Sequence, residues 1–154
     1  MKQKFQNKYK LSESIMKNIC VFGLGYIGLP TAAMFAHHGA KVTGVDVNQH
    51  AVDTINQGKI HIVEPGLEAI VKKAVDNGNL TASLTPLHSE AYLIAVPTPF
   101  KGEDYEPDLS YIKAVSKALA PLLQKGDIVI LESTSPVGAT EKMVEWLAED
   151  RADL

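Results

Sequence analysis

Gly23-Leu24-Gly25-Tyr26-Ile27-Gly28 is the stretch that decides the fold of this 154-residue chain. The residues before it, 18–22, form a short apolar run that predicts a buried strand. The residues after it, 30–38, have the composition of a helix, which Gly39 is placed to stop. A strand, a glycine turn and a helix in this order predict the first unit of a βα fold.

The spacing of the three glycines predicts a turn that approaches a phosphate. Gly23 permits the tight turn, Gly25 lets a pyrophosphate come close to the backbone, and Gly28 lets the helix pack against the strand. The N-terminus of the following helix offers unpaired N–H groups and a positive dipole end. The alternative is that the glycines only build a turn, because a glycine fingerprint by itself is a weak signal.

Beyond the glycine turn, short β-branched runs alternate with longer stretches of helical period, which predicts a Rossmann-type, doubly wound parallel α/β sheet. The expected strands lie at 41–45, 80–84, 91–96 and 127–132, and the expected helices at 48–58, 65–77, 109–126 and 140–149. We place residues 18–154 in one domain and interpret residues 1–17, rich in lysine, as a disordered extension.

Several local expectations accompany this pattern. Pro65 is expected in the first turn of its helix, and Pro121 is expected to bend the long helix. Residues 101–107 are expected to form a polar loop, and Asp127–Glu132 a buried strand. In the last helix, the apolar stripe that should face inward consists of Met143, Val144 and Leu147.

Composition excludes several classes of function. A net charge of −3 gives no electrostatic reason to expect nucleic-acid binding. The single cysteine excludes an internal disulfide and a cysteine-rich zinc site, and the histidines show no metal-ligand spacing. No apolar run has the length of a membrane helix or of a signal peptide. We therefore expect a cytoplasmic protein without metal.

Asp46 follows Gly28 by 18 residues, at the end of the second expected strand. A carboxylate at this place accepts both hydroxyls of an adenosine ribose and repels a 2′-phosphate. No arginine follows in the next turn, so the sequence predicts NAD rather than NADP as the cofactor. The alternative is a solvated aspartate at a strand end.

Two later loops follow strands at the edge where parallel sheets bind ligands, and they carry Thr98 and Thr134. Their hydroxyls either reach the nicotinamide half of the cofactor or bond to their own backbone in the turn. Cys20 lies inside the first expected strand, so we interpret it as a core residue and not as a nucleophile.

Five motifs together resemble the N-terminal portion of the UDP-glucose/GDP-mannose dehydrogenase family, over residues 18–154. They are Gly-Leu-Gly-Tyr-Ile-Gly-Leu-Pro at 23–30, Gly-Val-Asp-Val-Asn at 44–48, Glu-Pro-Gly-Leu at 64–67, Val-Pro-Thr-Pro-Phe at 96–100 and Glu-Ser-Thr-Ser-Pro-Val-Gly at 132–138. The resemblance implies that Tyr26, Ile27, Asp46, Thr98 and Thr134 contact NAD. It also implies oxidation of the C6 alcohol of a nucleotide sugar to a carboxylate in two NAD-dependent steps.

The family's catalytic Lys, Asn and Cys, its sixth strand and its UDP-binding domain are implied to lie beyond the matched part. We therefore expect this polypeptide alone to bind NAD weakly and to have no catalytic residues of its own. Without a sixth strand, Ile128–Leu131 is expected to form an apolar sheet edge prone to self-association. The alternatives are a non-catalytic NAD-sensing module and a dehydrogenase of the β-hydroxyacid type.

Overall fold

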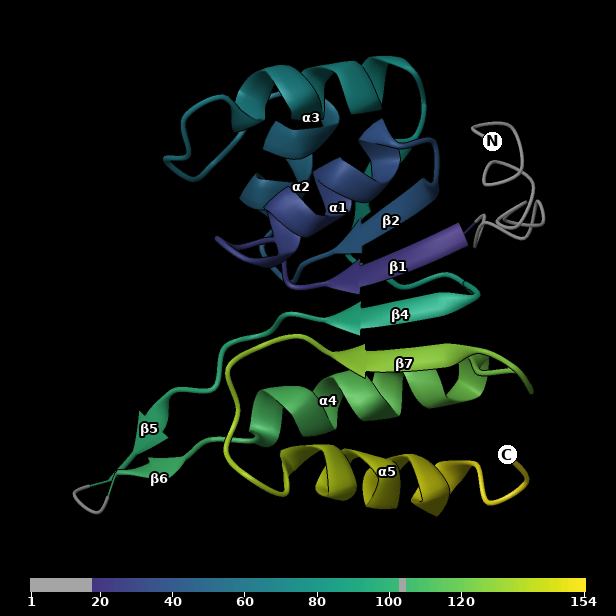
Figure 1. The fold of residues 1–154 in the computed structure, drawn as a ribbon. Coiled ribbons are helices and arrows are strands. Elements are labelled where there is room, and N and C mark those ends of the chain that lie inside the picture. Colours follow the sequence, from purple (N-terminus) through teal and green to yellow (C-terminus); the bar gives the residue numbers. More distant parts are fainter. Residues whose placement is uncertain (1–17, 103–104) are drawn as a thin grey trace, which may run out of the picture.

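The computed structural model describes residues 18–102 and 105–154, so the expected extension over residues 1–17 lies outside the described residues. Five parallel strands form one sheet in the order β3-β2-β1-β4-β7 (Figure 1). They are β1 (Asn18–Phe22), β2 (Lys41–Val45), β3 (Leu80–Ser83), β4 (Ala91–Ile94) and β7 (Ile128–Leu131). The predicted parallel α/β sheet is confirmed.

Helices cover both faces of the sheet. The helices α1 (Gly28–His37), α2 (Gln49–Asn56) and α3 (Leu67–Asp76) gather at the top of Figure 1, and α4 (Ser110–Leu119) and α5 (Ala139–Asp150) at the bottom. From β1 the chain moves outward to β2 and β3, then returns to place β4 on the other side of β1. This reversal opens a crevice at the carboxyl ends of β1 and β4, where sheets of this kind bind ligands.

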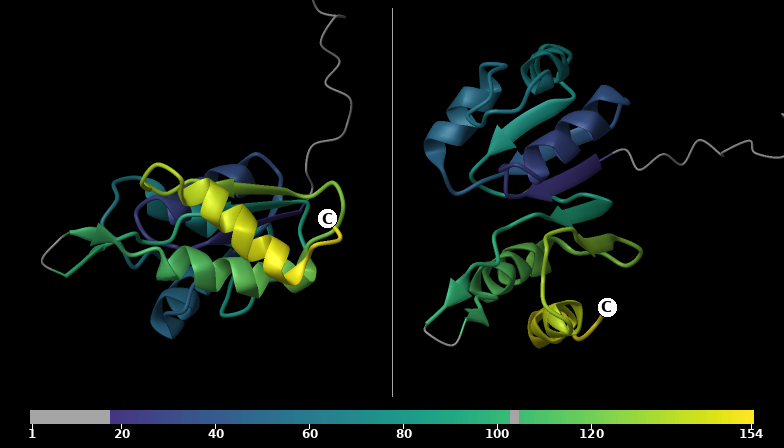
Figure 2. Two further views of the ribbon diagram at one scale, coloured as in Figure 1. Left: turned by 90° about the horizontal axis from the view of Figure 1, so that it is seen from below. Right: turned by 60° about the vertical axis from the view of Figure 1, so that its left-hand side comes forward.

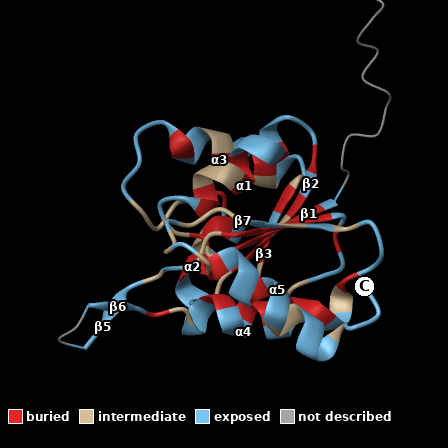
Figure 3. Ribbon diagram, turned by 60° about the horizontal axis from the view of Figure 1, so that its bottom comes forward, coloured by how far each residue is buried: buried red, intermediate tan, exposed pale blue. Residues whose placement is uncertain are grey.

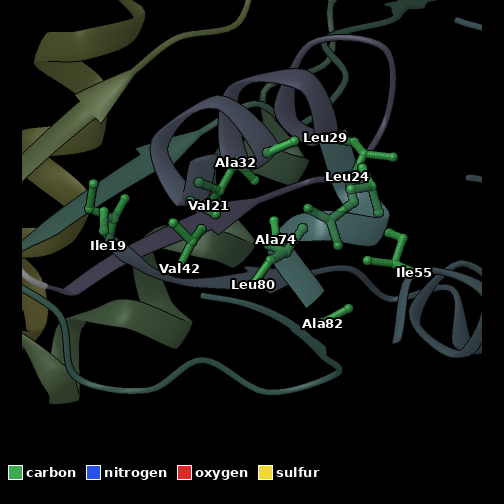
Figure 4. Close-up of a cluster of buried hydrophobic side chains, with 14 of the residues drawn as sticks. Ile19, Val21, Leu24, Leu29, Ala32, Val42, Ile55, Ala74, Leu80 and Ala82 are labelled. Atoms are coloured by element: carbon green, nitrogen blue, oxygen red, sulfur yellow. The ribbon is translucent and has the colours of Figure 1, made fainter. Parts of the chain in front are cut away.

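Two hydrophobic cores fill the space between the sheet and its helices. Along β1, Ile19 and Val21 point into the core under α1, α2 and α3, which Figure 4 shows in close-up. Cys20 and Phe22 point into the core under α4 and α5. Buried residues lie mainly on the strands and on the helix sides that face them (Figure 3). A sheet covered on both faces explains why its inner strands β1, β2 and β4 are mainly apolar.

The sequence predicted the start of helix α2 correctly and the start of helix α3 incorrectly. Asn48 caps α2, because its side chain accepts hydrogen bonds from the backbone N–H groups of His50 and Ala51. The expectation for Pro65 is wrong: Gly66, at φ 82°, precedes α3, and Pro65 lies in the turn before it. Only glycine adopts that left-handed conformation at little cost, so the helix begins after Gly66.

The loop expected at residues 101–107 is partly a hairpin. Strands β5 (Phe100–Lys101) and β6 (Glu106–Pro107) pair antiparallel and project from the body of the molecule (Figures 1 and 2). Two-residue strands carry no periodicity, so the sequence pattern did not predict them. The long helix does not bend at Pro121: α4 ends at Leu119 and a 3₁₀ turn, η1 (Ala120–Leu122), follows.

Two burial predictions near the C-terminus are also wrong. Strand β7 is only half-buried, because Ile128 and Ile130 on one of its faces are 42% and 44% exposed. Val144 points outward on α5 and is 57% exposed, whereas Met143 is buried and Leu147 packs against the core. Among the described helices, none combines the length and apolar character that crossing a membrane requires.

Candidate functional site

A cleft of about 560 Å³ lies at the carboxyl ends of β1, β2, β4 and β7. It contains all the residues that the sequence predicted as cofactor contacts except Gly28, which is buried in the first turn of α1 beneath the cleft. The lining residues are Phe22, Gly23, Gly25, Tyr26, Ile27, Val45, Asp46, Val47, Ala95, Val96, Pro97, Thr98, Tyr111, Ala114, Val115, Ser133 and Thr134. The lining is mainly apolar, and its polar groups sit on the loops, as is common in small-molecule sites.

Packing explains two of the three glycines. Gly23 has a φ of +85°, and a Cβ added there would lie 2.6 Å from the carbonyl oxygen of Ala95. A Cβ on Gly28 would lie 1.8 Å from the carbonyl oxygen of Gly23. Both contacts are with backbone atoms, which cannot move aside. These two glycines therefore let the turn close and the helix start directly against it, as the sequence predicted.

Gly25 differs, because a Cβ added there would meet nothing within 4 Å. Neither packing nor a positive φ requires glycine at this position, yet it faces the cleft. The N-terminus of α1 follows at once, without a side-chain cap and without an acidic residue in its first turn. Leu29 and Thr31 donate their N–H groups to the carbonyls of Gly25 and Ile27, and Pro30 has none, so the N–H groups left for a ligand are those of residues 26–28. Beside the open backbone of Gly25 they can form a cradle for an anion such as a pyrophosphate.

Asp46 lies at the end of β2 and binds the glycine turn. Its Oδ2 accepts the backbone N–H of Leu24 at 2.8 Å, and its Oδ1 accepts the backbone N–H of Asn48 at 2.9 Å. A carboxylate has about four acceptor positions, so two remain for hydroxyl groups in the cleft. The side chain is therefore fixed in place and still able to accept from a ribose.

The two threonine loops are bound to each other. The Thr98 hydroxyl donates to the backbone carbonyl of Thr134, and the Ser133 hydroxyl donates to the carbonyl of Val96 at 2.7 Å. For Thr98, the structure thus shows a bond to another loop rather than to its own turn. The hydroxyl oxygen keeps its acceptor positions, and the Thr134 side chain lines the cleft.

Sequence reasoning missed two exposed residues of the cleft lining. Val47 is 97% exposed directly after Asp46, and Tyr111 on α4 is 47% exposed. Val47 could have been predicted, because it is the chain neighbour of Asp46. Tyr111 was not predictable in this way, because only the packing of α4 against the sheet brings it to the cleft.

Cys20 is not part of the cleft. It is fully buried in the sheet, where burial raises the pKa of its thiol to about 12. A thiol in this state is not a nucleophile at neutral pH. Over residues 18–102 and 105–154, His, Cys, Asp and Glu form no group that could hold a metal ion.

Comparison with known proteins agrees with this geometry. Residues 17–154 match the NAD-binding domain of the UDP-glucose/GDP-mannose dehydrogenase family. UDP-N-acetyl-D-mannosamine dehydrogenase of Escherichia coli (strain K12) is 65% identical over 136 residues, which are 88% of this chain and 32% of that protein. The Campylobacter jejuni protein of the same name is 62% identical over 136 residues, 88% of this chain and 33% of that protein.

Solved structures show the same relationship. The UDP-N-acetyl-mannosamine dehydrogenase of Staphylococcus aureus superposes with a TM-score of 0.83 at 38% identity, over 89% of this chain and 34% of that one. A ternary complex of GDP-mannose dehydrogenase from Pseudomonas aeruginosa gives a TM-score of 0.81 at 33% identity, over 88% and 33%. The chain spans about one third of the length of these relatives. It therefore belongs to the UDP-glucose/GDP-mannose dehydrogenase family, whose NAD-binding domain it contains.

Proposed function

We propose that this chain is the cofactor half of an enzyme that oxidises UDP-N-acetyl-D-mannosamine to its uronic acid with two NAD. The support is the name shared by relatives at 62% and 65% identity, together with the family's NAD-binding domain. We further propose that the enzyme is cytoplasmic and has a role in surface polysaccharide biosynthesis. Residues 18–154 are proposed to be the folded unit of this chain. The UDP-sugar is the substrate of a full-length enzyme.

The main support for the proposal is that the glycine turn, which can bind an anion, and the fixed carboxylate of Asp46 line the same cleft. In our assignment the pyrophosphate lies over Gly23, Gly25 and Gly28, beside the backbone of Tyr26 and Ile27. Asp46 accepts the hydroxyls of the adenosine ribose. A 2′-phosphate would meet this carboxylate, so NAD is the preferred form.

The two walls of the cleft then take the two ends of the cofactor. Val47 follows Asp46 directly in the chain, and we assign Val47 and Tyr111 to the adenine. Thr98 and Thr134 lie on the other side and orient the nicotinamide through their oxygen atoms. When bound, NAD supplies a hydride acceptor, and the protein supplies its position and orientation.

The chain alone is expected to bind NAD without oxidising the sugar. Its one thiol, Cys20, is buried away from the cleft with a pKa of about 12. The test is a calorimetric titration of the purified chain with NAD and with NADP, followed by incubation with NAD and UDP-N-acetyl-D-mannosamine. We expect binding of NAD in preference to NADP and no NADH. Equal affinity for NAD and NADP would refute the assignment of Asp46 to the adenosine ribose. Formation of NADH would refute the expectation that the chain alone does not oxidise the sugar.

A further inference from the structure

The loop after β4 carries a hydroxyl group whose proton is already engaged. The Thr98 hydroxyl donates to the backbone carbonyl of Thr134, which has no proton to give in return. A hydroxyl group has one proton and two lone pairs, so the Thr98 oxygen can only accept further hydrogen bonds. A ligand group that pairs with Thr98 must therefore bring a donor.

The backbone around Thr98 keeps its hydroxyl in this arrangement. Pro97 and Pro99 flank Thr98 in the chain, and prolines on both sides restrict the backbone conformations of this segment. The two loops are bound a second time, because the Ser133 hydroxyl donates to the carbonyl of Val96 at 2.7 Å. Turning the Thr98 proton towards a ligand would cost its hydrogen bond to the neighbouring loop. The oxygen is therefore held as an acceptor before any ligand arrives.

The cleft offers no cation to an anionic group bound beside Thr98. Among the described residues that line the cleft, Asp46 alone carries a formal charge, and that charge is negative. Lys101 follows Thr98 by three residues, but its ammonium lies 2.7 Å from Asp108, and Lys101 does not line the cleft. An anion beside Thr98 would lose part of its hydration without gaining a cationic partner, which costs free energy.

A primary amide and a carboxylate have nearly the same shape but present different groups to this oxygen. The amide has a nitrogen that donates and an oxygen that accepts, whereas both oxygens of a carboxylate accept. The amide nitrogen can pair with Thr98, whereas a carboxylate oxygen would meet the lone pairs of another acceptor. The Thr134 hydroxyl lines the same cleft and can donate to one oxygen of either group, so it does not relieve the repulsion at Thr98.

We propose that Thr98 makes the cleft selective for the amide form of the dinucleotide. Its oxygen accepts an N–H of the nicotinamide carboxamide. Nicotinic acid adenine dinucleotide, in which a carboxylate replaces that amide, binds more weakly because it brings no donor to Thr98 and no cation compensates its charge. This proposal rests on the proposed function, which assigns the nicotinamide to Thr98 and Thr134.

A purely structural role for the Thr98 hydroxyl predicts a different result. If the hydroxyl only joined the two loops, its loss would loosen them and weaken the binding of both dinucleotides alike. An acceptor role predicts that the ratio of the two affinities changes. Because both dinucleotides contain the same adenosine and pyrophosphate, the ratio is independent of how tightly the chain binds that half.

The first test is a calorimetric titration of the purified chain at neutral pH with NAD, nicotinic acid adenine dinucleotide and ADP-ribose, which lacks the pyridine ring. We expect NAD to bind at least about tenfold more tightly than the acid form. The acid form should bind no more tightly than ADP-ribose. Equal affinity for NAD and the acid form would overturn the selectivity and leave the proposed function standing, whereas absence of NAD binding would overturn both.

The second test assigns the selectivity to Thr98 with three variants. Thr98→Val removes the hydroxyl and keeps the shape, so the preference for NAD over the acid form should fall to less than about threefold. Thr98→Ser keeps a hydroxyl and should keep the preference. Thr140→Val, at an exposed position on α5 outside the cleft, is the matched control and should change neither affinity. An unchanged preference in Thr98→Val would overturn the proposal.

Discussion

The Asp46 carboxylate accepts the backbone N–H of Leu24 at 2.8 Å, which joins the end of β2 to the glycine turn after β1. Two functions thus meet in one side chain: Asp46 holds the turn in place and offers its remaining acceptor positions to a ribose. Substitutions at Asp46 and in the turn should separate these contributions.

Asp46→Asn should weaken NAD binding about 10- to 100-fold, because hydrogen bonds to a charged acceptor are stronger than those to an amide. The affinity for NADP should fall less, since the repulsive charge is also removed. Titration calorimetry with both cofactors measures the two effects. Asp53→Asn, an exposed carboxylate on α2 outside the cleft, is the matched control. An unchanged ratio of NAD to NADP affinity would show that Asp46 does not bind the hydroxyls of the adenosine ribose.

Gly25→Ala and Gly28→Ala should fail in different ways. A Cβ at position 25 would enter open space, so the Gly25→Ala protein should fold normally and lose NAD affinity. A Cβ at position 28 would lie 1.8 Å from the carbonyl oxygen of Gly23, so Gly28→Ala should destabilise the fold by more than about 3 kcal/mol. Thermal unfolding and NAD titration distinguish the two. Full NAD affinity in Gly25→Ala would argue against the phosphate position.

Cys20 should behave as a core residue. At pH 8 its thiol, with a pKa of about 12, should resist a thiol reagent in the native protein and react once the protein is unfolded. Cys20→Ala should cost about 1–2 kcal/mol of stability and leave NAD affinity unchanged. Rapid labelling of the native chain, or loss of cofactor binding in the variant, would contradict this role.

The base of the β5–β6 hairpin should be sensitive to acid. The Lys101 ammonium lies 2.7 Å from Asp108 and, with hydrogen bonds from Ser110, lowers the pKa of Asp108 from 3.8 to about 2. A lowered pKa in the folded state means that the stabilisation is complete above about pH 4 and is lost as the pH falls through about 2.

Thermal unfolding of the wild type and Asp108→Asn at several pH values would measure this contribution. The wild type should be the more stable protein above about pH 4, and the difference should shrink as the pH falls and vanish below about pH 2. The Lys101→Met variant should show a smaller pH dependence, because it removes the largest cause of the lowered pKa and keeps the hydrogen bonds from Ser110. A difference that stays constant down to pH 2 would contradict the assignment.

Local signals predicted the elements around the cleft well. The five residues of β2, the Asn48 cap and the glycine turn all depend on short-range geometry, which the residue types themselves determine. The carboxylate of Asp46 could be predicted for the same reason, since the end of a strand fixes its place. The hydrogen bond between Asp46 and the backbone N–H of Leu24 could not be predicted, because this bond depends on how β1 and β2 pair.

Features that depend on distant packing were not predictable. Val144 and Met143 are neighbours on α5, and only the angle at which the helix meets α4 and the sheet decides which of them is buried. The apolar run of β7 predicts a buried strand, but no helix of the described chain covers its second face. Tyr111 reaches the cleft from α4 through tertiary packing alone.

The hydroxyls of Thr98 and Ser133 connect the loop after β4 to the loop after β7. The wall of the cleft that these two loops form is consequently preformed, and little backbone entropy remains to be lost there when a ligand arrives. Binding there should therefore proceed without a detectable loop-closure step, at a rate governed by diffusion and by electrostatic attraction to the N-terminus of α1.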